Sequence, residues 1–221
     1  MTGKLYLVAT PIGNLEDISP RALKVLSDTN FILCEDTRTS NILLTHYNIK
    51  NTLISYHAHN EDERIKYVIS RIVNGENVAL ISDSGTPLIS DPGSKLVRAC
   101  IQNNIEIVPI PGANAIIPAL LLSGFEIDKF YFEGFLPQKK GRQTKLKEIC
   151  SRKVLTVFYE SPYRIPKLLN ELNSLSPNSE IVLCRELTKK FEEVIRGKVS
   201  ELYKKINTLK LKGEFTIVFK S

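Results

Sequence analysis

The segment Ile81–Gly93 carries more groups able to do chemistry than any other part of the chain. It holds two aspartates, four hydroxyl side chains, two prolines and two glycines, after the apolar run Val78–Ile81 and before a helical pattern that begins near Ser94. A simple connection needs only a few residues, and open α/β sheets bind ligands at the carboxyl ends of their strands. We therefore predict a ligand-binding loop, stiffened by its prolines and opened to close backbone approach by its glycines.

Two further turns place ionisable side chains after strand-like runs. Glu35, Asp36 and Arg38 follow the second run. Their carboxylates could accept a proton, and the same turn could start a helix with Asp36 as its N-cap and an exposed arginine. His57 and His59 follow the third run, but no cysteine or third histidine lies nearby in sequence, so we expect a polar turn and no metal.

The first and fifth strand-like runs end in turns rich in glycine and proline. The first turn contains Pro11 and Gly13, and the fifth contains Gly112 and Ala115. Neither matches the glycine pattern of dinucleotide sites or the P-loop, which removes the usual support for those ligands. Small side chains here leave space for a ligand, or serve close packing of a helix on a sheet.

Alternating strands and helices would bring these turns to one edge of a sheet. We predict an α/β protein with two α/β domains, residues 1–123 with a mainly parallel sheet and residues 124–221 with a mixed sheet, joined by a hinge at Ser123–Asp128. The expected strands are short, apolar or β-branched runs. They are Leu5–Ala9, Phe31–Cys34, Leu53–Tyr56, Val78–Ser82, Ile105–Ile110, Phe130–Phe132, Val154–Tyr159, Ile181–Cys184, Val194–Arg196 and Phe215–Phe219.

Composition limits the class of protein. Hydrophobic residues make up 43% and charged residues 24%, which is ordinary for a soluble globular chain. No apolar run approaches the ~18 residues of a membrane span, and Met1–Lys4 enters a strand directly, without room for a signal peptide. The four cysteines are scattered and form no C-x-x-C pair, so we expect a cytoplasmic protein without disulfides.

Positive charge is concentrated in the second half of the chain. Residues 1–125 contain ten Lys and Arg against twelve Asp and Glu, a balance of −2, and residues 126–221 contain twenty against twelve, a balance of +8, which together give the net +6. A basic half suggests a polyanionic partner such as nucleic acid, although lysine-rich surfaces also keep proteins soluble. The basic runs are Lys139, Lys140, Arg142, Lys145 and Lys147, then Lys189 and Lys190.

Taken together and in this order, the motifs resemble those of the bacterial ribosomal RNA small subunit methyltransferases of the tetrapyrrole methylase superfamily. The likeness spans essentially the whole chain, although Ser84 stands where an alanine is usual and longer members continue past the position of Phe219. The matching segments are Ala9–Asp17, Glu35–Arg38, Ser55–His57, His59–Glu61, Asp83–Gly93, Pro111–Gly112, Phe132–Pro137, Tyr159–Pro162, Arg185–Lys189 and Lys212–Glu214.

The resemblance implies S-adenosylmethionine as methyl donor, bound in a cleft between the two α/β domains, and a homodimer. It implies the 2′-hydroxyl of a cytidine ribose in the decoding region of 16S ribosomal RNA as acceptor, presented on the 30S subunit. By position, the donor site maps onto Pro11, Gly13, Asp83, Gly85, Thr86, Pro87, Gly112 and Ala115, with Glu160 and Ser161 as further contacts from the second domain.

A ribose hydroxyl is a weak acid, so its proton needs an acceptor. Glu35, Asp36, His57 and Glu186 could fill this role. We predict Asp36, because a carboxylate at the end of a strand is held more rigidly than one in mid-loop, with Arg38 orienting a phosphate or the base. No metal is expected, since the sulfonium already activates the methyl group.

Two other functions compete with this interpretation. A small-molecule methylase of the same superfamily, acting on a corrin-type macrocycle or a modified histidine (diphthine type), would share the donor cleft but would not need the lysine-rich segment Gln138–Lys147. A non-catalytic RNA-binding module would have no use for a buried donor pocket, and would show no affinity for S-adenosylmethionine.

Overall fold

The structure is a computed structural model that describes residues 2–221. Its first sheet is all parallel, as predicted. Each connection between strands that follow one another in the chain contains a helix. In spatial order the strands are β3 (Leu53–Ser55), β2 (Phe31–Cys34), β4 (Val78–Ile81), β1 (Lys4–Val8) and β5 (Glu106–Ile110). The connecting helices are α1 (Pro20–Asp28), α2 (Thr37–His46), α3 (Glu61–Val73) and α4 (Ser94–Gln102), with the short 3-10 helix η1 (Leu15–Asp17) before α1.

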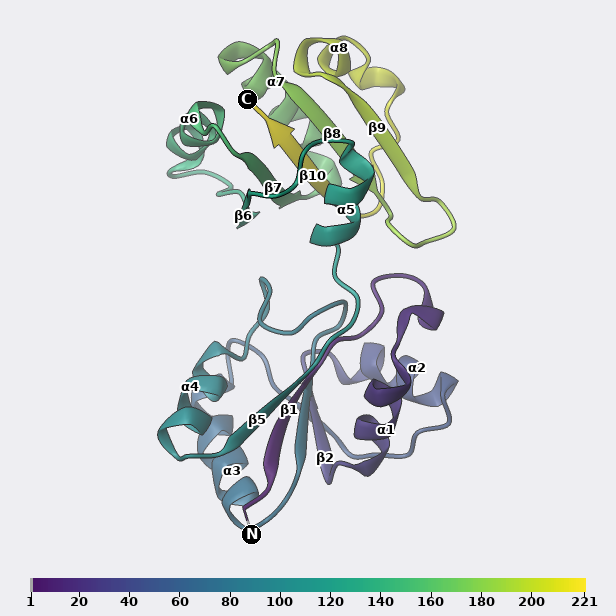
Figure 1. Cartoon of the computed structure of the whole chain (residues 1–221), viewed down its shortest axis with the longest axis vertical. Helices are drawn as coiled ribbons and strands as arrows, with labels where there is room; N and C mark the ends of the chain where they lie inside the picture. The colour runs from purple at the N-terminus through teal and green to yellow at the C-terminus, as the bar shows by residue number, and fades with distance from the viewer. Residues whose placement is uncertain (1) are drawn as a thin grey trace. The chain divides into compact units, whose positions relative to one another are not determined.

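Both faces of this sheet are covered by helices (Figure 1). On one face Leu26 of α1, Leu44 of α2 and Ile32 of β2 belong to one buried apolar cluster. On the other face Val68 of α3 and Leu96 of α4 belong to a second apolar cluster. Because side chains alternate along a strand, a sheet buried on both faces needs the continuous apolar runs seen in β2 and β4. This arrangement leaves the carboxyl ends of the strands as the place where polar turns gather.

The second sheet is mixed, which confirms the sequence prediction. In spatial order its strands are β6 (Phe130–Phe135), β7 (Leu155–Glu160), β10 (Phe215–Lys220), β8 (Glu180–Arg185) and β9 (Glu193–Lys198). Only β6 and β7 pair in parallel, and the other neighbours are antiparallel. The helical segments of this part are α5 (Ile116–Ser123), α6 (Arg142–Ser151), η2 (Pro162–Arg164), α7 (Ile165–Leu175), α8 (Val199–Lys204) and η3 (Ile206–Thr208).

The chain divides into two compact units between Asn114 and Ala115. The sequence analysis places this boundary after residue 123, and the difference is the helix α5. This helix packs on β7, β8 and β10, while α6, α7 and α8 contribute to the main core of the second unit. Its apolar sequence predicts a buried helix but gives no sign of which sheet it covers. No helix within residues 2–221 is both long and apolar enough to cross a membrane.

Candidate functional site

The turns after β1 and β4 are clasped together in the first unit. Thr10 and Gly85 form an isolated antiparallel bridge, with their backbone N–H groups donating to each other's carbonyls at 2.9 and 3.1 Å. The Thr10 hydroxyl donates to the Ser82 carbonyl at 3.1 Å, and the Ser82 hydroxyl donates to the Gly85 carbonyl at 3.0 Å. These bonds order a loop that would otherwise lose its backbone partners where the strands end.

Gly85 and Gly112 occupy positions where an added side chain would be crowded by the protein itself. Gly85 has φ of +86°, and a Cβ there would approach Cγ2 of Ile12 at 3.2 Å. A Cβ on Gly112 would lie 2.9 Å from Cβ of Ala9. The Thr86 hydroxyl donates to the Ala113 carbonyl at 3.0 Å. The turns after β1, β4 and β5 therefore contact one another, so motifs that are separate in sequence lie together in space.

The predicted donor-site residues of the first unit differ in how accessible they are. Gly13, Asp83 and Gly112 are exposed, Pro11 and Thr86 are half-buried, and Gly85 and Pro87 are buried. The exposed residues and the exposed backbone of the turns can meet a ligand directly. Gly85 and Pro87 are buried and can support the loop. The remaining predicted contacts, Ala115, Glu160 and Ser161, belong to the second unit.

Asp36 is the N-cap of α2, which confirms the helix-start interpretation of this turn. Its Oδ1 accepts the backbone N–H of Arg38 at 2.8 Å, and its Oδ2 accepts Nη2 of Arg38 at 2.7 Å. The backbone N–H of Asp36 donates to Oδ1 of Asp83 at 3.1 Å, which ties the β2 turn to the β4 loop. The Arg38 side chain, 89% exposed, holds the pKa of Asp36 at about 2. Such a carboxylate is a weak proton acceptor.

Asp91, near the end of the loop after β4, is a functional candidate that the sequence pattern alone did not indicate. Burial, together with the neighbouring carboxylates of Glu35 and Asp83, raises the pKa of Asp91 to about 6. Glu35 is exposed, and among residues 2–221 it makes no ion pair and no side-chain hydrogen bond. The strand ends thus gather negative charge that is not neutralised within the unit. An Asp-Pro-Gly turn closing a long loop was the only available sequence signal.

The turn after β3 is built around a buried glutamate. Oε1 of Glu61 accepts the Tyr56 hydroxyl at 2.8 Å and the backbone N–H of Gly93 at 3.1 Å. This joins the β3 turn to the far end of the loop after β4, and burial beside Glu61 raises the pKa of Tyr56. Glu61 therefore has a structural role in this turn. Nδ1 of His57 is buried and has no hydrogen-bond partner among the described residues, and no metal-binding group of three or more acidic, His or Cys residues was found there.

In the second unit Glu160 belongs to a buried ionic network. It is 2% exposed, and its carboxylate accepts Nη1 of Arg142 at 2.9 Å, the backbone N–H of Ser161 at 2.9 Å, and Nε of Arg164. Nε of Arg142 also donates to Oε2 of Glu171 at 2.7 Å. Arg142 is itself 2% exposed, so it does not belong to the basic surface run in which the sequence analysis includes it.

Glu186, another predicted proton acceptor, is also engaged by its own unit. Its Oε1 accepts Nζ of Lys189 at 3.0 Å and the backbone N–H of Glu214 at 2.9 Å. Its side chain covers Gly213, where a Cβ would lie 2.4 Å from Cδ of Glu186. The Arg185–Lys189 and Lys212–Glu214 motifs are thus two halves of one contact.

Comparison with known proteins places the whole chain in one context. Residues 4–203 match the family described as Tetrapyrrole (Corrin/Porphyrin) Methylases. The chain is 45% identical over 217 residues to "Ribosomal RNA small subunit methyltransferase I" of Halalkalibacterium halodurans, covering 98% of this chain and 75% of that protein. It is 44% identical over 216 residues to the protein of the same name from Thermotoga maritima, covering 98% of this chain and 97% of the relative.

Solved structures with this fold act on different compounds, as their names say. Uroporphyrin-III C-methyl transferase from Thermus thermophilus, complexed with S-adenyl homocysteine, has a TM-score of 0.70 at 15% identity, covering 99% of this chain and 98% of that one. A diphthine synthase has a TM-score of 0.77 at 13% identity, covering 99% and 90%. At such low identity these likenesses establish the fold alone, which confirms the predicted architecture.

Proposed function

The chain belongs to the tetrapyrrole methylase family, and we propose that it transfers the methyl group of S-adenosylmethionine to the 2′-hydroxyl of a cytidine ribose in the decoding region of 16S ribosomal RNA. The observation that carries this proposal is the identity of 44–45% over nearly the full chain to proteins named ribosomal RNA small subunit methyltransferase I. The excess of positive charge after residue 125 supports an RNA substrate. The diphthine synthase and the porphyrin enzyme share only the fold, so they do not favour a small-molecule substrate.

The strand-end turns of the first unit fit a cationic donor. S-adenosylmethionine, when bound, supplies a methyl group already activated by its sulfonium, and it also carries an ammonium group. The carboxylates of Glu35, Asp83 and Asp91 stand close enough to raise the pKa of Asp91, so a bound cation would relieve their mutual repulsion. We assign donor binding to these turns, with Pro11, Gly13, Asp83, Thr86 and Gly112 in contact, and Gly85 and Pro87 supporting the loop.

We further propose that Glu35, rather than Asp36, accepts the proton of the ribose hydroxyl. Asp36 is bonded to Arg38 through both carboxylate oxygens and has a pKa of about 2, so it holds the start of α2 in place. Glu35 lies one residue earlier, is exposed, and has both oxygens available within the described residues. A positioned acceptor of this kind contributes roughly 100-fold or more to a rate.

The reaction is tested by incubating the protein with labelled donor and 30S particles, and by mapping the labelled nucleotide on the RNA. Label on one ribose 2′-hydroxyl is expected, with none on corrin-type precursors. Label on macrocycle precursors alone would refute the RNA assignment. Measured at saturating donor, Glu35→Gln should lose most turnover, and Asp36→Asn should lose less. If Asp36→Asn lost more turnover than Glu35→Gln, Asp36 would be the proton acceptor.

The assembled 30S subunit is the proposed form of the substrate, and a homodimer the proposed form of the enzyme. Comparing naked 16S RNA with 30S particles tests the first, with faster methylation expected on the particle. Sedimentation at micromolar concentration tests the second, and a monomer that retains full activity would contradict it.

A further inference from the structure

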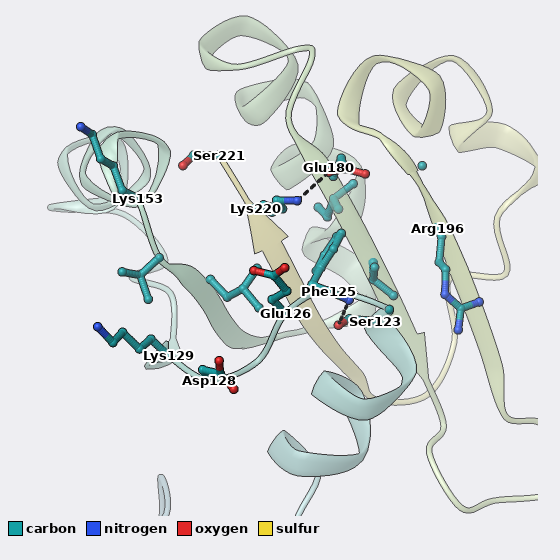
Figure 2. Close-up of a pocket in the computed structure, with 16 residues that line it drawn as sticks. Ser123, Phe125, Glu126, Asp128, Lys129, Lys153, Glu180, Arg196, Lys220 and Ser221 are labelled. Carbon is teal, nitrogen blue, oxygen red and sulfur yellow. Dashed lines mark hydrogen bonds and ion pairs between the residues drawn. The ribbon is translucent and has the colours of Figure 1, made fainter.

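An open hollow of about 980 Å³ lies in the second unit, and none of the residues that line it is among the site residues assigned above. It sits at the end of the sheet where β10 finishes and β7 and β8 begin, and the segment between α5 and β6 forms one wall (Figure 2). This segment overlaps with Ser123–Asp128, which was predicted from the sequence as a hinge. Ligand pockets of ~300–1,000 Å³ accept molecules of nucleotide size.

The cations around this hollow come from separate segments, and two of them are free. Lys129 and Lys153 are exposed, lie on the same side of the hollow in Figure 2, and make no ion pair within residues 2–221. Arg196, on the opposite side, donates from Nε to the Leu122 carbonyl at 3.0 Å. Lys220 is paired with Glu180 at 3.4 Å. Lys129 and Lys153 are therefore the two cations on this side of the hollow that can meet an anionic group.

The same hollow also contains free negative charge and apolar surface. Glu126 and Asp128 are exposed and make no ion pair among the described residues. The Phe125 ring lies between the two sides in Figure 2, with Nζ of Lys220 at 5.2 Å from its centroid, and Val154 is 39% exposed. Two unpaired carboxylates disfavour a simple phosphate ligand. A ligand that joins an anion, hydrogen-bond donors and a flat apolar ring would use all three kinds of group.

We propose that this hollow binds one unpaired nucleotide of the RNA, with a base that carries an exocyclic amino group. Lys129 and Lys153 contact the phosphate, which gives affinity without sequence information. Glu126 and Asp128 accept hydrogen bonds from the amino group, as carboxylates do from the cytosine amine. Phe125 and Val154 form the apolar wall for the ring, since unpaired bases of RNA pack on such side chains. This inference rests on the proposed action on RNA, and uracil, which has no amino group, is the base it excludes.

The test compares labelled hexacytidylate with hexauridylate, which have equal length and charge, by fluorescence anisotropy on the whole protein. We expect hexacytidylate to bind roughly tenfold more tightly. Replacing the carboxylates together, Glu126→Ala with Asp128→Ala, should abolish this preference. Replacing the lysines, Lys129→Ala with Lys153→Ala, should weaken both oligonucleotides equally and reduce the slope of log affinity against log salt by about one, since a single phosphate loses its cations.

The matched control removes two exposed lysines of the first unit, Lys24→Ala with Lys66→Ala, and should change neither preference nor slope. Equal affinity of the wild-type protein for the two oligonucleotides, or an equal effect of the control, would overturn the inference. Free cytidine monophosphate that competes as well as the hexanucleotide would also overturn it, because the site would then serve a small molecule.

Donor binding and 30S methylation, measured on the same preparations, separate this inference from the proposed function. If the protein methylates 30S particles but shows no base preference, only the proposed role of the hollow is refuted. If it shows the preference but does not methylate, only the proposed reaction is refuted.

Discussion

Neighbouring carboxylates at one edge of the first sheet have opposite properties because their partners differ. The Arg38 guanidinium and the N-terminus of α2 hold the pKa of Asp36 at about 2, whereas burial near Glu35 and Asp83 raises the pKa of Asp91 to about 6. The first carboxylate stays charged and fixed, and the second carries a charge that a cation would stabilise. The pKa therefore separates a positioning role from a ligand-binding role.

Donor affinity should depend on the ionisation of Asp91. A cationic donor favours the charged carboxylate, so its affinity should fall as the pH drops from about 7 to about 5 through the pKa of about 6. The variant Asp91→Asn should bind more weakly near pH 7 and show no such pH dependence. Calorimetric titration across this range checks both, and an unchanged pH dependence in the variant would contradict the assignment.

The same residue should make the donor-free protein less stable than it could be. A carboxyl whose folded pKa is raised from 3.8 to about 6 loses stabilising protonation as the pH rises through that window. Above it, the folded state retains the cost of a half-buried charge. Asp91→Asn should therefore raise the free energy of unfolding by about 1 kcal/mol near pH 8, after allowing for solvent screening, with the difference vanishing near pH 4. Urea titrations at the two pH values measure this effect.

At the scale of elements, the apolar pattern predicted both sheets, because short apolar runs such as those of β2, β4 and β8 are typical of buried strands. The burial of Arg142 could not be predicted, because an arginine in a lysine-rich run is expected at the surface. Its partners, Glu160 and Glu171, are distant in sequence. The hollow was invisible for the same reason: its wall residues come from separate strand ends. Tertiary pairing of distant segments is what the sequence pattern lacks.

The clasp between the β1 and β4 turns gives a prediction about a single element. Gly85→Ala would place a strained φ of +86° and a Cβ at 3.2 Å from Ile12 under the bridge to Thr10. Gly124→Ala is the matched control, because Gly124 has φ of +76° with no atom within 4 Å of the added Cβ. Both should lose about 1 kcal/mol of unfolding free energy from backbone strain. Gly85→Ala alone should lose additional unfolding free energy and also donor affinity. Denaturation and calorimetry measure these two quantities. Equal effects of the two variants would show that the contact between the β1 and β4 turns does not support the donor loop.

Across the whole molecule, the basic excess of the second half consists of two classes of cation. Arg142, Lys145, Arg152 and Lys189 are tied to carboxylates of their own unit. Lys139 and Lys140 are exposed and make no ion pair among residues 2–221. Net charge alone does not distinguish cations paired within the fold from those free to contact a phosphate. Burial and ion pairing do distinguish them.

This division predicts opposite outcomes for two charge removals of neighbouring residues. Arg142→Ala leaves the buried Glu160 with Arg164 as its remaining cationic partner, so the free energy of unfolding should fall by up to ~3–5 kcal/mol. Lys139→Ala with Lys140→Ala should leave stability unchanged but lower affinity for 30S particles and reduce the salt slope of binding, because fewer counterions are released from the RNA. Thermal unfolding and binding titrations from low to moderate salt separate the two effects, with Arg142→Lys as the variant that keeps the buried charge if Arg142→Ala does not fold. If the double lysine variant lost stability while its salt slope stayed unchanged, these lysines would belong with the structural cations.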